Sequence, residues 1–97
     1  MDVVFQLQGV EFEWDEEKCA VNLQKHGVSF EVAAEVFFDP FYQTGDASVS
    51  EEKRDYIVGY TFLQKLLLVV FVKRGKRTRI VSARHVAPME RELYEKS

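Results

Sequence analysis

An uninterrupted apolar run over residues 66–72 limits the choice of folds for this chain more than any other feature. A strand with apolar side chains at every position needs cover on both faces, which is the situation of a central strand in a sheet. The run is well short of a membrane span. With 97 residues, 46% of them hydrophobic, the chain can build one core but not two. We therefore expect a single domain over residues 1–97.

Alternating apolar and polar side chains predict further strands. Residues 3–7 and 10–14 alternate in opposite phases on either side of Gly9, which marks a bulge or a turn. Residues 54–61 and 78–84 predict two later strands, and residues 41–44 could add a short one. The segment between positions 45 and 53 is a polar loop, a common place for functional residues.

Two helices are predicted between residues 15 and 38. Asp15 and Ser29 are good N-caps, Gly27 suits the left-handed position after a helix, and apolar side chains recur at helical spacing over positions 30–37. A third helix is expected to start near Pro88. Because helices and strands are grouped instead of alternating, we expect an α+β fold with one antiparallel sheet, an N-terminal αα-hairpin and a C-terminal helix.

Charge is divided between the two halves of the chain. The first 52 residues carry 12 acidic and 2 basic side chains, and the last 45 carry 4 acidic and 11 basic ones. The net charge of −3 therefore hides a basic C-terminal half. An asymmetry of this size points to a polyanion, a charged protein partner, or both.

The end of the first predicted helix carries a polar, basic patch. Helix spacing puts Asn22, Lys25 and His26 on one face, with Lys18 one turn before Asn22. Cations in a last helical turn are also favoured by the helix dipole, so a purely structural role is the alternative. An imidazole can nonetheless donate or accept a proton near neutral pH.

Three arginines lie in or next to predicted strands. The planar, permanently charged guanidinium groups of Arg54, Arg79 and Arg84 suit phosphate binding and the stabilisation of an oxyanion. Strict alternation puts positions 79 and 84 on opposite faces, so both can serve one site only if a bulge or the strand end intervenes. The alternative is that Arg79 and Arg84 pair with the excess N-terminal carboxylates.

Other chemistry has weak signals. His26 and His85 have no metal-ligand spacing and Cys19 has no partner thiol, so no metal site is predicted and a reducing compartment fits. The first residues lack the basic start of a secretory signal, which favours a cytosolic protein. Tyr56 and Tyr60 share a strand face and could stack bases, although such pairs more often belong to a core.

Four sequence blocks carry a family resemblance. In order and separation they resemble the BrnT family of toxins: Phe12-Glu13-Trp14-Asp15, residues 22–31 (NLQKHGVSFE), Phe37-Phe38-Asp39-Pro40 and residues 79–84 (RIVSAR). The resemblance runs from about residue 10 to residue 95, including the closing helix, and leaves residues 1–9 as an N-terminal extension. Lys73 departs from the family, in which an acidic residue is common at this position.

The resemblance implies a function. It implies a RelE-like ribonuclease toxin of a type II toxin-antitoxin system, which cuts RNA without a metal or other cofactor and inhibits translation and growth in the bacterial cytoplasm. It also implies a cognate BrnA-type antitoxin with a DNA-binding domain, an oligomer with that antitoxin, and contact with operator DNA only through it. No membrane partner is implied.

Carried over residue by residue, the resemblance implies catalytic roles for Lys25, His26, Glu52, Arg54, Arg79 and Arg84. Further RNA contacts are expected at Asn22, Tyr56 and Arg77. Glu51 is the alternative to Glu52 because the two are adjacent.

Metal-free RNA cleavage needs a base for the 2′-hydroxyl, an acid for the 5′-oxygen and fixed positive charge. Glu52 or His26 is the candidate base, His26 or Lys25 the candidate acid, and the arginines hold the phosphate. The rival interpretation is a non-catalytic module that binds nucleic acid or antitoxin, including an inactive co-repressor with a toxin fold. The net charge of −3 favours this rival slightly, since free RNA-binding domains are usually basic.

Overall fold

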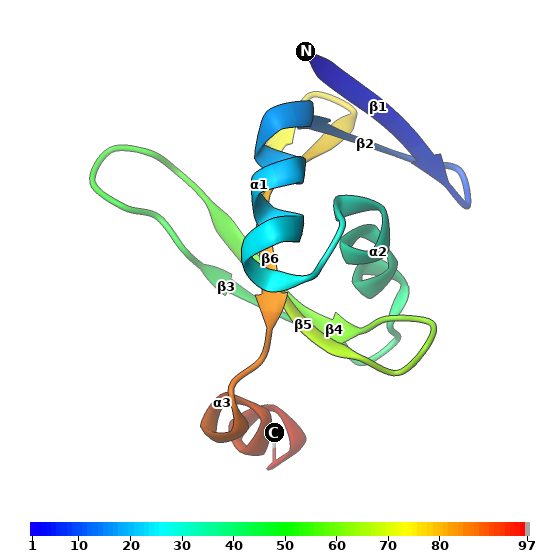
Figure 1. Cartoon of the computed structure of the whole chain (residues 1–97). Coiled ribbons are helices and arrows are strands. Elements are labelled where there is room, and N and C mark those ends of the chain that lie inside the picture. The colour runs from blue at the N-terminus through cyan, green and yellow to red at the C-terminus, as the bar shows by residue number, and fades with distance from the viewer. Residues whose placement is uncertain (97) are drawn as a thin grey trace.

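The computed structural model describes residues 1–96 as a single α+β domain with a six-stranded sheet (Figure 1). Its elements in chain order are β1 (Asp2–Leu7), β2 (Val10–Asp15), α1 (Glu16–His26), α2 (Phe30–Ala34), the 3-10 turn η1 (Glu35–Phe38), β3 (Gln43–Asp46), β4 (Asp55–Tyr60), β5 (Leu66–Arg74), β6 (Arg77–His85) and α3 (Pro88–Lys96). The strand order across the sheet is β1-β2-β6-β5-β4-β3. Within the described part of the chain, no helix has the length and apolar character to cross a membrane.

The sheet is mixed at one pair of strands. β2 and β6 run parallel, with Phe12 opposite Thr78 and Glu13 opposite Arg79, while the other neighbours are antiparallel. The prediction of an antiparallel sheet is therefore wrong at this pair and correct at the others. β6 returns to β2 only after two helices and three further strands, and local residue patterns carry no information on the direction of such a distant neighbour.

The core lies between the sheet and the two helices α1 and α2. Phe12 and Trp14 of β2 and Phe30 of α2 are at most 2% exposed, and the Trp14 and Phe30 rings meet edge to face with centroids 5.9 Å apart. Burying a side chain of this size contributes about 1.5–3 kcal/mol. The two caps predicted from the sequence are present, since Asp15 accepts a hydrogen bond from Lys18 N and Ser29 from Val32 N.

The segment after α2 departs from the sequence prediction. The helix gives way to η1 at residue 35, and the short strand β3 occupies residues 43–46 instead of 41–44. The cause is a turn at Asp39, whose carboxylate accepts the Phe41 N–H at 2.9 Å and whose carbonyl accepts the Tyr42 N–H at 3.2 Å. The chain can extend only after this turn.

A buried amide fastens α1 to β6. Asn22 is 6% exposed, and its side chain accepts the Ala83 N–H at 3.1 Å and donates to the Ala83 carbonyl at 2.8 Å. It also donates to the Val28 carbonyl at 3.0 Å. β2 pairs with β6 only at residues 78 and 79, so the amide of Asn22 takes the place of a neighbouring strand farther along. The contact fixes the last turns of α1 against the sheet.

A β-bulge changes the phase of β6. Val70 lies opposite Ser82 whereas Phe71 lies opposite Ile80, which leaves Val81 as an extra residue in β6. Ile80 and Ala83, both 1% exposed, therefore share the face that packs on the helices. Arg79 and Arg84 share the opposite face, because the predicted requirement of a bulge between them is fulfilled.

The face of the sheet opposite α1 and α2, termed the open face, is covered only in part. Leu67, Val69 and Phe71 of β5 are buried toward the helices, but the intervening side chains are only half-buried. α3 covers one end of the open face, where Leu68 faces it across a shallow hollow. The expected cover on both faces of the central strand is thus incomplete.

Candidate functional site

Two hollows lie side by side along α1 and β6. The first, the helix hollow, has a volume of about 430 Å³ and is lined by Asp15, Glu17, Lys18, Val21, Asn22, Lys25, His26, Val81 and Ser82. The second, the arginine hollow, has a volume of about 360 Å³ and is lined by Lys18, Glu52, Lys53, Arg54, Val72, Arg74, Arg79 and Val81. Because Lys18 and Val81 belong to both, the two hollows form one continuous surface, termed the basic groove.

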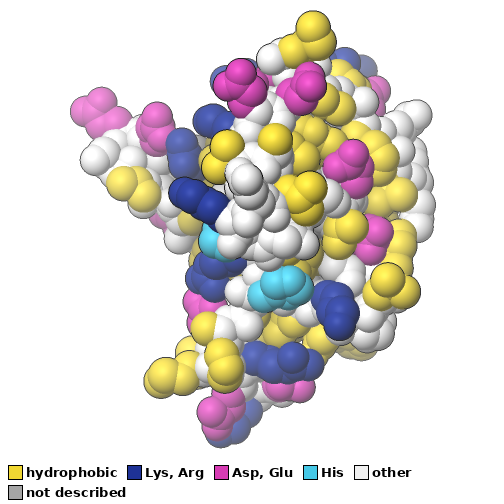
Figure 2. Space-filling model, in the orientation of Figure 1, with side chains coloured by type: hydrophobic (Ala, Val, Ile, Leu, Met, Phe, Trp, Pro, Cys, Tyr) yellow, Lys and Arg dark blue, Asp and Glu magenta, His cyan; other side chains and the backbone are white. Residues whose placement is uncertain are grey.

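Basic side chains gather in a notch of the molecular surface. Figure 2 shows several Lys and Arg side chains between the column formed by α1 and the arm that projects at the left, which Figure 1 identifies as the loop between β3 and β4. The residues of the arginine hollow come from this loop, from α1 and from the hairpin of β5 and β6. Fixed positive charge from separate parts of the chain therefore converges here.

The helix hollow carries the imidazole. α1 ends at His26 because Gly27 adopts φ +69° and its N–H bonds to the Leu23 carbonyl at 2.8 Å. Lys25 and His26 are exposed in this last turn, where the helix dipole favours cations. Lys25 and His26 therefore have the structural position that the alternative interpretation expected for cations in a last helical turn. The same geometry leaves both side chains open to a ligand.

The arginine hollow carries the candidate base. Arg54 Nη2 donates to Glu52 Oε2 at 2.7 Å, and 69% of the Glu52 side chain is exposed. The loop that holds this pair is closed by Ser48, whose hydroxyl accepts the Arg54 N–H at 3.1 Å. The pairing of Arg54 with Glu52 places a carboxylate and a guanidinium together at the mouth of the hollow.

Arg79 is held between two carboxylates. Its Nη1 donates to Glu13 Oε2 at 2.6 Å and to Asp2 Oδ2 at 3.1 Å, and its Nη2 donates to Asp2 Oδ1 at 3.2 Å. The hydrogen bonds that Arg79 donates to Asp2 and to Glu13 raise the pKa of Arg79, and the guanidinium lowers the pKa of Asp2 in return. The predicted pairing of Arg79 with N-terminal carboxylates is correct, and the residue also lines the groove.

Three predicted residues lie away from the groove. Arg77 donates to Glu11 at 2.9 Å, a contact that raises its pKa. Arg84 forms two hydrogen bonds of 2.8 and 2.9 Å with Glu90 of α3, so its partner is on the C-terminal helix and not in the N-terminal half. Tyr56 lines the hollow beneath α3, and its ring lies over Gly45.

Asn22 lines the helix hollow, but its side-chain amide forms hydrogen bonds with the backbone of Ala83 and Val28. Sequence reasoning placed Lys18 in the polar, basic patch without assigning it a catalytic role, and it missed two other groove residues, Lys53 and Arg74. Helix spacing pointed to Lys18, which follows Asp15 by three residues and lies one turn before Asn22. No local pattern indicates that Arg74, at the end of β5, meets the loop that carries Lys53.

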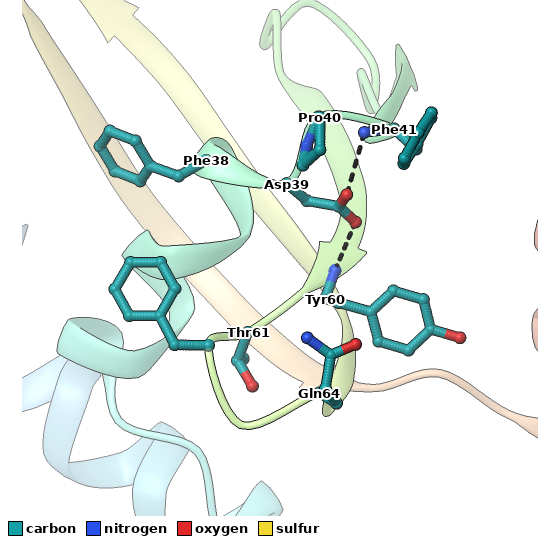
Figure 3. A pocket seen from close by; sticks show the side chains of 8 residues that line it. Phe38, Asp39, Pro40, Phe41, Tyr60, Thr61 and Gln64 are labelled. Carbon is teal, nitrogen blue, oxygen red and sulfur yellow. Dashed lines mark hydrogen bonds between the residues drawn. The ribbon is translucent and has the colours of Figure 1, made fainter.

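A hollow larger than either the helix hollow or the arginine hollow lies elsewhere. It has a volume of about 530 Å³ and is lined by Phe38, Asp39, Pro40, Phe41, Tyr60, Thr61, Phe62 and Gln64 (Figure 3). The carboxylate of Asp39 is already engaged by Phe41 N, by Tyr60 N at 2.8 Å and by the Tyr94 hydroxyl at 3.0 Å. Burial and then the contact with Asp39 raise the pKa of Tyr94 to about 12. This Asp39 is a structural anchor that joins η1, β4 and α3.

Among residues 1–96, no group of three or more His, Cys, Asp or Glu side chains is placed to hold a metal ion.

Comparison with known proteins identifies the family. The model of the family described as "Ribonuclease toxin, BrnT, of type II toxin-antitoxin system" matches residues 14–90. The crystal structure of the Brucella abortus ribonuclease toxin BrnT resembles this fold with a TM-score of 0.53 and 21% identity, covering 76% of this chain and 92% of that chain. A search of curated proteins finds no match. Since the family match spans most of the sequence, the chain belongs to the BrnT family of ribonuclease toxins of type II toxin-antitoxin systems.

Proposed function

We propose that this chain is a metal-independent endoribonuclease and that the basic groove is its active site. The observation that carries the proposal is the sharing of Lys18 and Val81 by the two hollows. It brings the exposed imidazole of His26 and the cations of the arginine hollow onto one surface. Membership of a family described as ribonuclease toxins supports the same conclusion.

The chemistry follows from the two sides of the groove. The scissile phosphate lies against Lys18, with Arg54 and Arg79 stabilising the charge that develops on its oxygens. The 2′-oxygen attacks the phosphorus while its proton passes to Glu52, and the bond to the 5′-oxygen breaks as that oxygen takes a proton from His26. Lys25 adds positive charge beside His26. The products are a 2′,3′-cyclic phosphate and a 5′-hydroxyl.

The remaining predicted residues have peripheral roles in this proposal. Arg84, Arg77 and Tyr56 lie outside the groove, so they contact RNA only if the bound strand extends across the open face. Asn22 acts by positioning α1. The fold is RelE-like, and residues 1–9 are an addition to it.

The proposed partner is a BrnA-type antitoxin with a DNA-binding domain. Its occupation of the basic groove would exclude RNA, and the resulting oligomer would reach operator DNA through the antitoxin alone. RNA cleavage in the bacterial cytoplasm would account for inhibition of translation and growth. The rival candidate remains a non-catalytic binding module, which the net charge of −3 favours slightly.

The test is cleavage of an end-labelled RNA oligonucleotide with EDTA present. We expect turnover by the wild type, a loss of about 100-fold or more in His26→Ala and Arg54→Ala, and little change in Arg91→Ala, whose side chain lies on α3 and pairs with Glu95. An oligonucleotide with 2′-deoxyribose throughout should bind but stay intact. Binding of RNA by the wild type with no cleavage would reject the nuclease in favour of the binding module.

A further inference from the structure

The N-terminal strand brings a carboxylate to the edge of the basic groove. β1 pairs with β2 along its whole length, with Asp2 opposite Asp15 and Val4 opposite Glu13. Asp2 and Glu13 therefore lie on neighbouring strands on the open face, where both reach Arg79. Residues 1–13 lie outside the range matched by the family model, so the Asp2 contact comes from a part of the chain that the family model does not cover.

The two carboxylates hold Arg79 in different ways. The Glu13 side chain is 11% exposed and makes one short bond to Nη1, so it anchors the guanidinium from within the protein. The Asp2 side chain is 56% exposed and engages both Nη1 and Nη2. Two parallel N–H···O bonds from one guanidinium are also how arginine binds a phosphate. Asp2 thus occupies, from the solvent side, the edge of Arg79 that an incoming phosphate needs.

We propose that Asp2 is a built-in competitor for substrate phosphate, and that β1 thereby sets the affinity of the basic groove for phosphodiesters. This inference rests on the proposed function, which assigns the basic groove as the RNA site. In the resting protein the Asp2 carboxylate neutralises the outer edge of Arg79. A bound strand displaces it, while Glu13 keeps the guanidinium in place.

The energetics allow such an exchange. Ion pairs between exposed groups are weak and are screened by salt, so displacement of Asp2 costs little. Arg74, which lines the arginine hollow, also lowers the pKa of Asp2, in agreement with a position of the carboxylate close to the groove. β1 itself stays in place during the exchange, because Phe5 packs against Trp14 with ring centroids 5.6 Å apart.

The test compares Asp2→Asn with Glu11→Gln. Both variants remove one negative charge from the open face, and Glu11 pairs with Arg77 outside the groove, which makes it a matched control. The probe is a fluorescent, uncleavable 2′-deoxy oligonucleotide at low salt. We expect Asp2→Asn to bind about threefold tighter or more than the wild type, Glu11→Gln to bind nearly as the wild type does, and the difference to shrink at high salt.

Equal affinities of Asp2→Asn and the wild type would overturn the proposal, as would an equal gain in Glu11→Gln, which would reveal an effect of net charge alone. The same variants are assayed for RNA cleavage, which separates this inference from the proposed function. Tighter binding by Asp2→Asn without cleavage by any variant would reject the nuclease and keep the competitor. Cleavage by the wild type with no effect of Asp2→Asn on binding would keep the nuclease and reject Asp2 as a competitor.

Discussion

The side-chain amide of Asn22 bonds to both the N–H and the carbonyl of Ala83, 61 residues away in the sequence. The contact completes the hydrogen bonding of β6 where β2 no longer accompanies it, and it holds the helix that ends in Lys25 and His26. The geometry of the helix hollow therefore depends on a residue whose polar atoms face inward.

Asn22→Ala should lower the free energy of unfolding by about 2–3 kcal/mol, because the buried backbone groups of Ala83 and Val28 lose their partners. The measurement is urea denaturation, with the exposed Gln24→Ala on the same helix as control. An RNA-binding role for Asn22 predicts a different result, in which the variant keeps its stability and loses affinity for RNA.

Lys18→Ala should weaken binding of a 2′-deoxy oligonucleotide, because the ammonium group borders both hollows. The slope of log K against log salt should become shallower by about the contribution of one phosphate contact. Lys96→Ala is the control, since that residue pairs with Glu92 on α3. An unchanged salt slope in Lys18→Ala would place the phosphates away from the junction of the hollows.

Docking of α3 should weaken at acidic pH. Arg84 and the Ala87 N–H lower the pKa of Glu90 from 4.5 to about 2. Because the pKa of Glu90 is lower in the folded state, the stabilisation is present above the unfolded-state pKa and is lost as pH falls through the folded-state pKa. Hydrogen exchange of α3 should therefore accelerate relative to the core between about pH 4.5 and pH 2. Glu90→Gln should abolish this dependence, whereas Glu92→Gln, whose partner Lys96 is on α3 itself, should preserve it.

Docking of α3 should also weaken in strong base. The pKa of Tyr94 is raised from 10.0 to about 12, so the folded state favours the protonated phenol that donates to Asp39 and to the Phe41 carbonyl. The stabilisation is complete below the unfolded pKa and is lost as pH rises through the folded one. Ultraviolet titration of tyrosine should show one phenol ionising late, and Tyr94→Phe should remove that phase. A late phase that persists in Tyr94→Phe would assign it to another tyrosine.

Elements specified by neighbouring residues could be predicted from the sequence. The caps at Asp15 and Ser29 and the glycine after His26 define α1 and the start of α2, and the apolar run defines β5. Local signals also placed Lys25 and His26 in one patch, because these adjacent residues lie one helical turn after Asn22. These features need no knowledge of distant contacts.

Features that depend on distant segments could not be predicted. The parallel pairing of β2 with β6 and the bulge at Val81 arise from the packing of strands far apart in sequence, and no glycine marks the bulge. Asn22 resembles an exposed member of a polar patch until β6 is seen to lack a neighbouring strand beside Ala83. The junction at Lys18 depends on the approach of the loop that carries Arg54 to α1, since both line the arginine hollow.

We propose that the helix hollow and the arginine hollow bind one substrate strand. The most direct test is titration of isotope-labelled protein with a 2′-deoxy oligonucleotide, following the backbone amide resonances of His26 and Arg54 by nuclear magnetic resonance. We predict that both resonances shift with the same midpoint and saturate at one oligonucleotide per protein, while Arg91 does not respond. A response of only one hollow, or two different midpoints, would contradict a single active site.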